Sequence, residues 1–161
     1  QAVTTQGFIT AHERGAITIL NPAPFAEISP ELIAVSDWII PNETEFAGMH
    51  PQGLEPTSDE IILELAATLK TRFAVTLGDK GAALTTLDGK VVRVNAPKVK
   101  AIDTTGAGDA FWTGFLYARL LGKDFEETIT IAQKLAVLKL QNVGRLPEGI
   151  NIQEYLGAEI K

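Results

Sequence analysis

The sequence predicts an α/β protein with a mixed, largely parallel sheet that is covered by helices on both faces. Short, apolar, β-branched runs alternate with segments of helical spacing, which is typical of parallel sheets. Between residues 81 and 94, two such runs flank Asp88-Gly89, a strong hairpin signal that adds antiparallel strands. The length of 161 residues suits one domain with a real core, so we expect a single domain over residues 1–161.

The strands are expected where short apolar runs occur. Besides the two strands of the hairpin, they are residues 16–20, 37–40, 73–77 and 98–102. In such sheets ligands bind outside the carboxyl ends of the parallel strands. Polar residues and glycine follow these ends, namely Asn21, Asn42, Gly78 and Asp103. We therefore expect these residues along one rim of the sheet.

Helical spacing and capping residues predict the intervening helices. The clearest is Thr57 to Lys70, in which apolar residues recur three and four positions apart. In Pro30 to Val35, Ser29 is the expected cap and proline takes the first helical position. The others are Val3 to Arg14, Asn42 to Ala47, Asp109 to Leu121, Phe125 to Leu140 and Asn151 to Ala158.

Composition excludes several classes of function. The net charge of −6 makes nucleic acid an unlikely main partner, because an acidic protein repels polyphosphate. The absence of cysteine excludes disulfides and zinc–thiolate sites, and it fits a cytoplasmic protein. No stretch approaches the roughly 20 apolar residues of a membrane span, and we expect that the start does not act as a signal peptide. We expect no membrane association.

Residues 103–109 combine two acids with a turn of small residues. A helix start presents free backbone amides and the positive end of its dipole, and glycines let an anion approach them. The amides of residues 106–109, from Gly106 to Asp109, would then form an anion hole, and the Asp109 carboxylate would take a proton from an attacking hydroxyl. Together they suit phosphoryl transfer. The alternative is an ordinary glycine-rich turn, in which the acid only favours the helix dipole.

The stretch DTTGAGDAFWTGF, residues 103–115, closely resembles the C-terminal signature of the PfkB or ribokinase family of carbohydrate kinases. Three other segments resemble family motifs in the same order: NPAP (21–24), PNETEF (41–46) and VTLGDKGA (75–82). The first two favour a ribokinase-like member. The resemblance covers nearly the whole chain and implies a ribokinase-like fold that phosphorylates a sugar hydroxyl with ATP.

The resemblance also implies roles for individual residues. Asp109 would be the catalytic base, and Gly106, Ala107 and Gly108 would form the anion hole. Asn42 and Glu45 would serve the nucleotide phosphates and the water shell of Mg²⁺. ATP would be held by Thr76, Gly78, Asp79, Lys80 and Gly81, and Gln133 would lie near the adenine.

Simpler alternatives exist for these residues. Asn42 and Glu45 fit a capping box, a pattern that recurs at Thr57 with Glu60 and at Asp124 with Glu127. Residues 78–81 also suit a hairpin connection with an exposed lysine, and Gln133 suits a helix face. His12 and His50 are expected at the surface, and Trp38 and Trp112 in the core.

A monovalent cation is a further expectation from the resemblance. Ribokinase-like members often hold K⁺ beside the loop that matches Asp103 and Thr105, and a later loop of small residues closes that site. In this sequence the later loop is residues 142–149, with Arg145 and Glu148 where small or hydroxyl residues are common. Either the Arg145 guanidinium replaces the cation, or Arg145 points to solvent and backbone carbonyls bind the ion.

The family's sugar-binding half, with its Gly-Gly motif and lid sheet, has no counterpart in this sequence. We therefore expect a fragment, a proteolytic product or a truncation that phosphorylates poorly by itself. The missing strands would expose an apolar sheet edge and favour a homodimer or another association. A nucleotide-binding or assembly module without catalysis stays open, as do kinases for fructose, nucleosides or keto-deoxy sugar acids.

Overall fold

The computed structural model describes residues 1–144, 147 and 149–157. The chain forms two compact units, Gln1–Gly78 with Ala83–Val92 and Asp79–Ala82 with Arg93–Lys161. Each unit contains its own cluster of buried apolar side chains.

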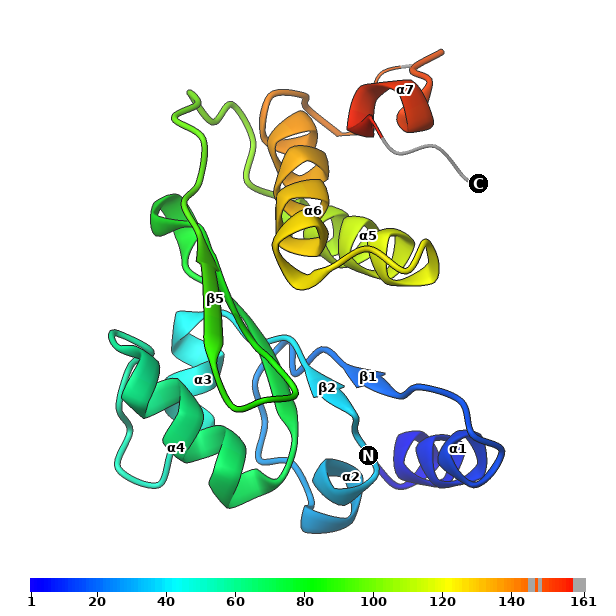
Figure 1. Cartoon of the computed structure of the whole chain (residues 1–161), viewed down its shortest axis with the longest axis vertical. Helices are drawn as coiled ribbons and strands as arrows, with labels where there is room; N and C mark the ends of the chain where they lie inside the picture. Colours follow the sequence, from blue (N-terminus) through cyan, green and yellow to red (C-terminus); the bar gives the residue numbers. More distant parts are fainter. Residues whose placement is uncertain (145–146, 148, 158–161) are drawn as a thin grey trace. The chain divides into compact units, whose positions relative to one another are not determined.

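A five-stranded sheet has the order β1-β2-β3-β4-β5 (Figure 1). The strands are β1 (Ile19–Leu20), β2 (Trp38–Ile39), β3 (Arg72–Thr76), β4 (Ala82–Thr85) and β5 (Val91–Val94). The first three are parallel, with Ile19 opposite Trp38 and Trp38 opposite Arg72. The connections after β3 and β4 are too short for a parallel crossover, so β4 runs antiparallel to β3, and β5 runs antiparallel to β4. The predicted α/β class and mixed sheet are confirmed.

The helices agree with the predicted ones to within two residues at each described end. They are α1 (Ala2–Glu13), α2 (Pro30–Ala34), α3 (Glu43–Met49), α4 (Asp59–Leu69), α5 (Ala107–Leu120), α6 (Phe125–Leu140) and α7 (Ile152–Leu156), with a 3₁₀ turn η1 (Gly78–Lys80). Ala158, the expected end of the last helix, lies outside the described residues. None of the described helices has the length and apolarity that a membrane span requires.

Side-chain caps fix the starts of several helices. The Ser29 hydroxyl accepts a hydrogen bond from the Leu32 amide (3.3 Å), as predicted for α2. Asp124 and Glu127 form the capping box predicted for α6, in which the Glu127 amide donates to Asp124 Oδ1 (2.8 Å). These bonds satisfy amides that the helix itself leaves without a partner.

The start of α4 differs from its predicted pattern. Its N-cap is Ser58, whose hydroxyl accepts from the Ile61 amide (3.5 Å). Thr57 therefore does not cap the helix, although Thr57 and Glu60 have the spacing of a capping box. Two adjacent hydroxyl residues compete for one capping position, and spacing alone does not choose between them.

The predicted strand over residues 98–102 is wrong. These residues form no ladder with the sheet. Instead, the amides of Ile102 and Asp103 both donate to the carbonyl of Leu140, at 2.8 and 3.2 Å. The last carbonyls of a helix lack partners within it, and here the end of α6 takes the amides that a neighbouring strand would have taken.

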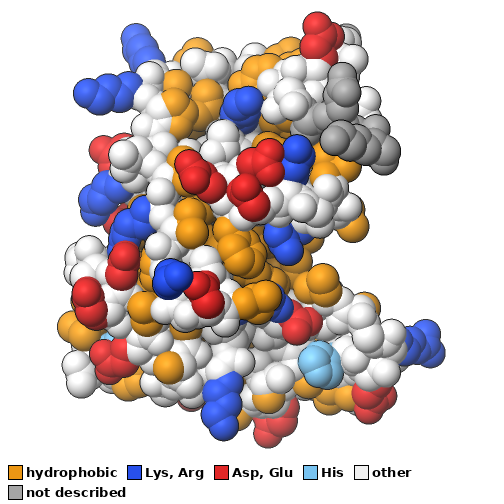
Figure 2. Space-filling model, in the orientation of Figure 1, with side chains coloured by type: hydrophobic (Ala, Val, Ile, Leu, Met, Phe, Trp, Pro, Cys, Tyr) orange, Lys and Arg blue, Asp and Glu red, His pale blue; other side chains and the backbone are white. Residues whose placement is uncertain are grey.

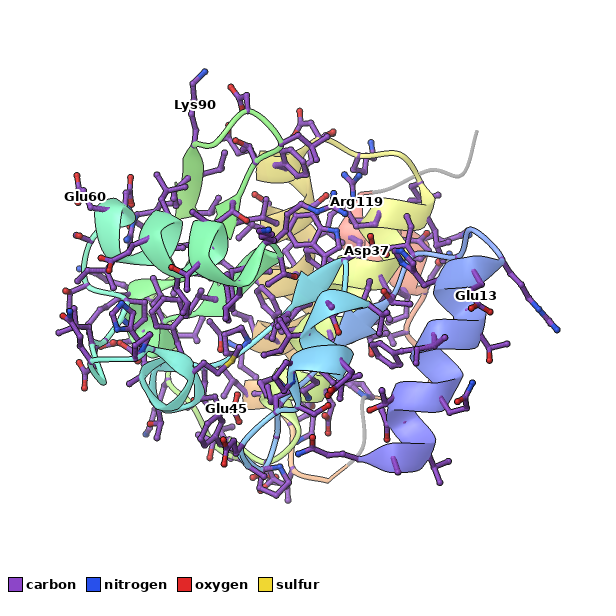
Figure 3. All side chains as sticks on the ribbon, turned by 90° about the horizontal axis from the view of Figure 1, so that it is seen from below. Glu13, Asp37, Glu45, Glu60, Lys90 and Arg119 are labelled. Carbon is purple, nitrogen blue, oxygen red and sulfur yellow. The ribbon has the colours of Figure 1, made fainter. Side chains whose placement is uncertain are left out.

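The hairpin of β4 and β5 forms as predicted. Gly89 adopts a φ of +75°, which glycine reaches without strain. The Thr86 amide donates to the carbonyl of Lys90 (2.8 Å), which closes the turn. Lys90 projects away from the ribbon at this turn (Figure 3), and its ammonium lies 2.7 Å from Asp88 Oδ2.

The core of the first unit lies where α3 and α4 pack on the sheet (Figure 1). The rings of Phe46 and Phe73 are fully buried and meet edge to face, with centroids 5.5 Å apart. Ile62 and Leu65, three positions apart on α4, belong to the same cluster. This packing fixes α3 beside β3, and so fixes the loop that precedes α3.

The amino ends of the first three strands are joined by a polar cluster. Asp37 Oδ2 accepts from the Thr18 amide (2.8 Å), and Arg72 Nε donates to the Asp37 carbonyl (3.2 Å). The Arg72 guanidinium also lies 4.5 Å from the centre of the Trp38 ring. Trp38 is 2% exposed, which confirms it as a core residue.

The predicted exposure of the two histidines and the predicted burial of Trp112 are only partly confirmed. His12 is exposed as predicted. The prediction that His50 lies at the surface is wrong, because His50 is 5% exposed at the end of α3. Its ring packs beside Phe46, and its Nδ1 accepts a hydrogen bond from the Gln52 amide (3.2 Å). Trp112 is half-buried, and its indole nitrogen has no hydrogen-bond partner within the described part of the chain.

In the second unit, α5 and α6 cross in close contact (Figure 1). Gly114 permits this approach, because a Cβ there would lie 2.7 Å from Ala132 Cα and 3.0 Å from the Ile131 carbonyl oxygen. Leu156 of α7 joins the buried cluster. The two long helices therefore form one packed layer that carries the start of α5.

Apolar side chains also reach the surface, among interspersed charges of both signs (Figure 2). β1 lies at one end of the strand order, and Ile17 just before it is 69% exposed. β1 is thus an end strand with an exposed apolar residue just before it, and an apolar sheet edge there stays a prediction. Association through that edge stays a prediction.

Candidate functional site

The start of α5 is built by the glycine turn of residues 106–108. Gly106 is the N-cap residue with a φ of +75°, a conformation that other residues rarely adopt. The first intrahelical bond runs from the Ala110 amide to the Gly106 carbonyl (2.9 Å). The amides of Gly108 and Asp109 come before that bond, and no side chain among the described residues caps the helix. These amides are available to an anion.

Asp109 lies in the first turn of α5 and is exposed to solvent. Its carbonyl accepts from the Thr113 hydroxyl (2.8 Å), as in a regular helix turn. Its Oδ2 lies 4.0 Å from the point that a Cβ on Gly106 would occupy. The carboxylate is therefore accessible and lies beside the glycine turn, a geometry that suits a base next to an anion site.

One predicted donor of the anion hole is already engaged. The Ala107 amide donates to the Thr104 carbonyl at 3.2 Å. Sequence spacing gave no sign of this bond, because it depends on the turn that residues 104–107 adopt. Of the four predicted amides, those of Gly106, Gly108 and Asp109 remain.

The carboxylate of Asp103 is contacted by three hydrogen-bond donors. Its Oδ1 accepts from the Thr105 amide (2.9 Å), and its Oδ2 faces the Gly144 amide (3.4 Å) and the Lys139 ammonium (3.5 Å). The hydrogen bonds from Thr105 foremost, then Gly144 and the charge of Lys139, lower the pKa of Asp103 to about 2. The carboxylate is ionised at neutral pH and fixes the loop that leads into α5.

Lys139 is a residue of this region that was not predicted from the sequence. It lies in the last turn of α6 and is 8% exposed. Its Cε lies 3.5 Å from the point that a Cβ on Gly106 would occupy. The sequence does show a lysine within an apolar helical segment, which could have indicated a buried charge. Its partner Asp103, however, is 36 positions away.

Two residues predicted to hold the nucleotide meet at the Val94 carbonyl. Gln133 is buried, and its Nε2 donates to that carbonyl at 2.8 Å. Gly81 has a φ of +108°, and a Cβ there would lie only 2.0 Å from the same oxygen. The Gln133 nitrogen is therefore used within the fold, and Gly81 is required by a close backbone approach.

Asp79 and Lys80 lie in the exposed turn η1. This agrees with the alternative of an exposed hairpin connection. Arg145 and Glu148, the residues considered for the cation site, lie outside the described residues.

In the first unit, Asn42 and Glu45 form the capping box of α3. The Glu45 amide donates to Asn42 Oδ1 and the Asn42 amide donates to Glu45 Oε2, both at 2.8 Å. The capping alternative is confirmed. Glu45 is 8% exposed, so its carboxylate is held rigidly by the box.

The carboxyl ends of β2 and β3 meet at one rim, as predicted. Thr76 pairs with Asn42 in an isolated parallel bridge, and its amide donates to the Pro41 carbonyl (3.0 Å). Gly78 follows with a φ of +56°, and a Cβ there would lie 3.8 Å from Glu43 Oε2. Residues of two predicted motifs, 41–46 and 75–82, are far apart in the sequence but lie together at this rim.

Comparison with known proteins shows which family the chain belongs to. The model of the pfkB family carbohydrate kinases matches residues 1–147. Ribokinase of Schizosaccharomyces pombe is 32% identical over 139 residues, 83% of this chain and 44% of that protein. Ribokinase of Haemophilus influenzae is 35% identical over 138 residues, again 83% of this chain and 44% of that protein.

The fold agrees with these sequence matches. The structure of Arabidopsis thaliana ribokinase complexed with ribose and ATP superposes with a TM-score of 0.84 at 28% identity, over 98% of this chain and 53% of that one. The chain thus spans about half the length of the relatives it matches. With the family model, the ribokinase relatives and the fold in agreement, the chain belongs to the pfkB family of carbohydrate kinases.

Proposed function

We propose that this chain carries the phosphoryl-transfer part of a ribokinase-like kinase, which transfers the γ-phosphoryl group of ATP to a sugar hydroxyl. The observation that carries the proposal is the start of α5, where the exposed Asp109 carboxylate lies beside backbone amides that precede the first helical bond. A base and fixed donors are the two devices that this reaction needs.

The step assigns each group one task. The sugar oxygen attacks the γ-phosphorus, the bond from that phosphorus to the leaving ADP oxygen breaks, and Asp109 takes the hydroxyl proton. The amides of Gly106, Gly108 and Asp109 stabilise the charge on the transferred group, because preorganised donors act without reorganising. The glycines allow the close approach.

Asn42, Glu45, Thr76 and Gly78 are proposed to contact the nucleotide phosphates or the water around Mg²⁺. Their rigid capping box and strand-end rim support this proposal. Among the described residues no cluster of three histidine or acidic side chains would hold a metal by itself. A Mg²⁺ ion that arrives with the phosphates fits this arrangement and neutralises their charge.

The contact of Gln133 within the fold narrows its proposed nucleotide role. Its amide nitrogen holds the Val94 carbonyl, next to Gly81. We assign Gln133 to shaping the backbone of residues 94–96, which would border an adenine, rather than to a direct hydrogen bond from that nitrogen. Asp79 and Lys80 keep their proposed place at the exposed turn.

The sugar-binding contacts are proposed to come from residues beyond this chain. The relatives named above are about twice as long as the region matched. By itself the 161-residue chain would then phosphorylate ribose poorly. Ribose is the first substrate to test because both of the similar curated proteins named above are ribokinases. Fructose, nucleosides and keto-deoxy sugar acids are the alternatives.

A second candidate function is a nucleotide-binding or assembly module without catalysis. This candidate is favoured because the chain matches only about half the length of its relatives. The two candidates differ in what Asp109 does, since pure binding needs no base.

The Asp109→Asn variant separates the candidates. We expect turnover to fall by about 10²-fold or more, because a general base is lost, while the Kd for ADP changes little. Transfer of radiolabelled phosphate from ATP to ribose is measured for the chain and for any longer product of its reading frame. Glu126→Gln is the matched control, an exposed acid in the first turn of α6. Unchanged turnover in Asp109→Asn would contradict the proposed chemistry.

A further inference from the structure

Lys139 is a buried cation placed beneath the glycine turn. Its ammonium lies 3.5 Å from Asp103 Oδ2 and donates to the Asn142 carbonyl at 3.2 Å. Its Cε and the Asp109 carboxylate both lie within 4.0 Å of the same point beside Gly106. A buried lysine is rare unless it is paired, so this placement has a specific cause.

The contacts of Asp103 do not fit a monovalent metal ion. Each described partner of its carboxylate is a donor: the Thr105 amide on Oδ1, and the Gly144 amide and Lys139 ammonium on Oδ2. A metal ion needs oxygen lone pairs that face it. A K⁺ ion bound to Asp103 Oδ2 would lie close to the Lys139 ammonium, which is 3.5 Å from that oxygen, and like charges repel.

We propose that Lys139 is a positioning residue that acts as a built-in cation: its ammonium fixes Asp103 and the turn of residues 104–106, so the site needs no monovalent metal. The inference rests on the proposed function, because it concerns the same turn. Lys139 supplies the positive charge for which Arg145 was the candidate from the sequence.

The position of the charge explains why it matters for an anion. Lys139 projects from the last turn of α6, where a cation also favours the helix dipole. From there its stem lies against Gly106, the residue that starts α5. Loss of the ammonium would leave Asp103 negative beside a turn that has to accept phosphate.

The first test compares cations on the unmodified 161-residue chain. The Kd for Mg²⁺ with a non-hydrolysable ATP analogue and the midpoint of thermal unfolding are measured in K⁺ and in tetramethylammonium at equal ionic strength. We expect both quantities to be the same in the two salts. A tighter Kd or a higher midpoint in K⁺ would overturn the inference without any variant.

The second test removes the ammonium. In Lys139→Ala the Kd for Mg²⁺ with a non-hydrolysable ATP analogue should rise by about tenfold or more, and methylammonium or K⁺ should restore it while tetramethylammonium does not. Lys139→Arg keeps the charge and should stay close to the unmodified chain. Lys134→Ala is the matched control, because that lysine of α6 donates to the Leu156 carbonyl and not to Asp103.

The outcomes separate the inference from the proposed function. Two results in Lys139→Ala contradict the built-in cation: normal binding of the ATP analogue, or a loss of binding that no small cation restores. An unmodified chain that does not bind the ATP analogue with Mg²⁺ contradicts the proposed nucleotide site. In that case the unfolding midpoints in the two salts still decide whether Asp103 takes a metal ion.

Discussion

At the scale of single residues, Gly81 is the position where a side chain is least tolerated. A Cβ there would lie 2.0 Å from the Val94 carbonyl oxygen and 2.7 Å from the Ala96 nitrogen, both backbone atoms. We predict that Gly81→Ala lowers the free energy of unfolding by about 3 kcal/mol or more, because strain at positive φ adds to the clash. Urea unfolding followed by circular dichroism measures it.

Gly89→Ala is the control for this substitution. Gly89 also has a positive φ, +75°, but a Cβ there would meet nothing within 4 Å. It should lose only about 1 kcal/mol, the cost of the backbone conformation alone. Equal losses in the two variants would show that the Val94 contact does not matter.

The carboxylate of Asp88 gives a prediction on pH. Hydrogen bonds from Lys90 and then Thr86 lower the pKa of Asp88 from 3.8 to about 2. A lowered pKa means that the ionised form favours the folded state, so this contribution is present above pH 3.8 and is lost as the pH falls through 2.

NMR titration of the Asp88 carboxyl carbon measures this directly. We expect a midpoint near pH 2 in the native chain, and a shift toward 3.8 in Lys90→Met. High salt should produce part of the same shift, because the pair is exposed. A native midpoint near 3.8 contradicts the hairpin contacts.

The residues of the site differ in how far sequence could predict them. Asp109 and its glycines lie within one short stretch, so helix-start chemistry was enough to identify them. The engaged amide of Ala107 depends on a turn, and Lys139 depends on a contact 36 positions away. Spacing along the chain contains neither fact.

At the scale of elements, the contact of α5 with α6 depends on Gly114. A Cβ there would lie 2.7 Å from Ala132 Cα, so we predict that Gly114→Ala costs about 1–3 kcal/mol by overpacking. Gly7→Ala in α1 is the matched control, since nothing lies within 4 Å of its Cβ position. It should stabilise by about 0.5–1 kcal/mol through helix propensity. Thermal and urea unfolding of both variants provide the comparison.

If Gly114→Ala were as stable as Gly7→Ala, the close crossing of the two helices would be wrong. Because α5 begins at the amides proposed to bind the terminal phosphate, the Gly114 variant should also weaken binding of Mg²⁺ with a non-hydrolysable ATP analogue, whereas the Gly7 variant should not.

The elements themselves were largely predictable. Amphipathic spacing, caps and the Asp88-Gly89 turn identified the helices and the hairpin, because these signals are local. Residues 98–102 have strand-like composition but lie against the end of α6, where the Leu140 carbonyl accepts a hydrogen bond from the Ile102 amide. A local pattern cannot tell which acceptor an extended segment will meet.

At the scale of the whole molecule, the free edge at β1 predicts association. Ile17 is 69% exposed beside that edge. We expect the mass of the chain in sedimentation equilibrium to rise with concentration, and Ile17→Lys to reduce this rise, because a charge on an edge opposes pairing. Leu87→Lys on the exposed hairpin is the control. A chain that stays monomeric at every concentration contradicts this prediction.

The central claim is that the amides at the start of α5 receive the terminal phosphate of ATP beside Asp109. It is tested most directly by NMR of the nitrogen-15-labelled chain, titrated with Mg²⁺ and a non-hydrolysable ATP analogue. We predict that the amide signals of Gly106, Gly108 and Asp109 shift most, and that Ala107, already bonded to Thr104, shifts less. Saturable binding that leaves these signals in place would contradict the account.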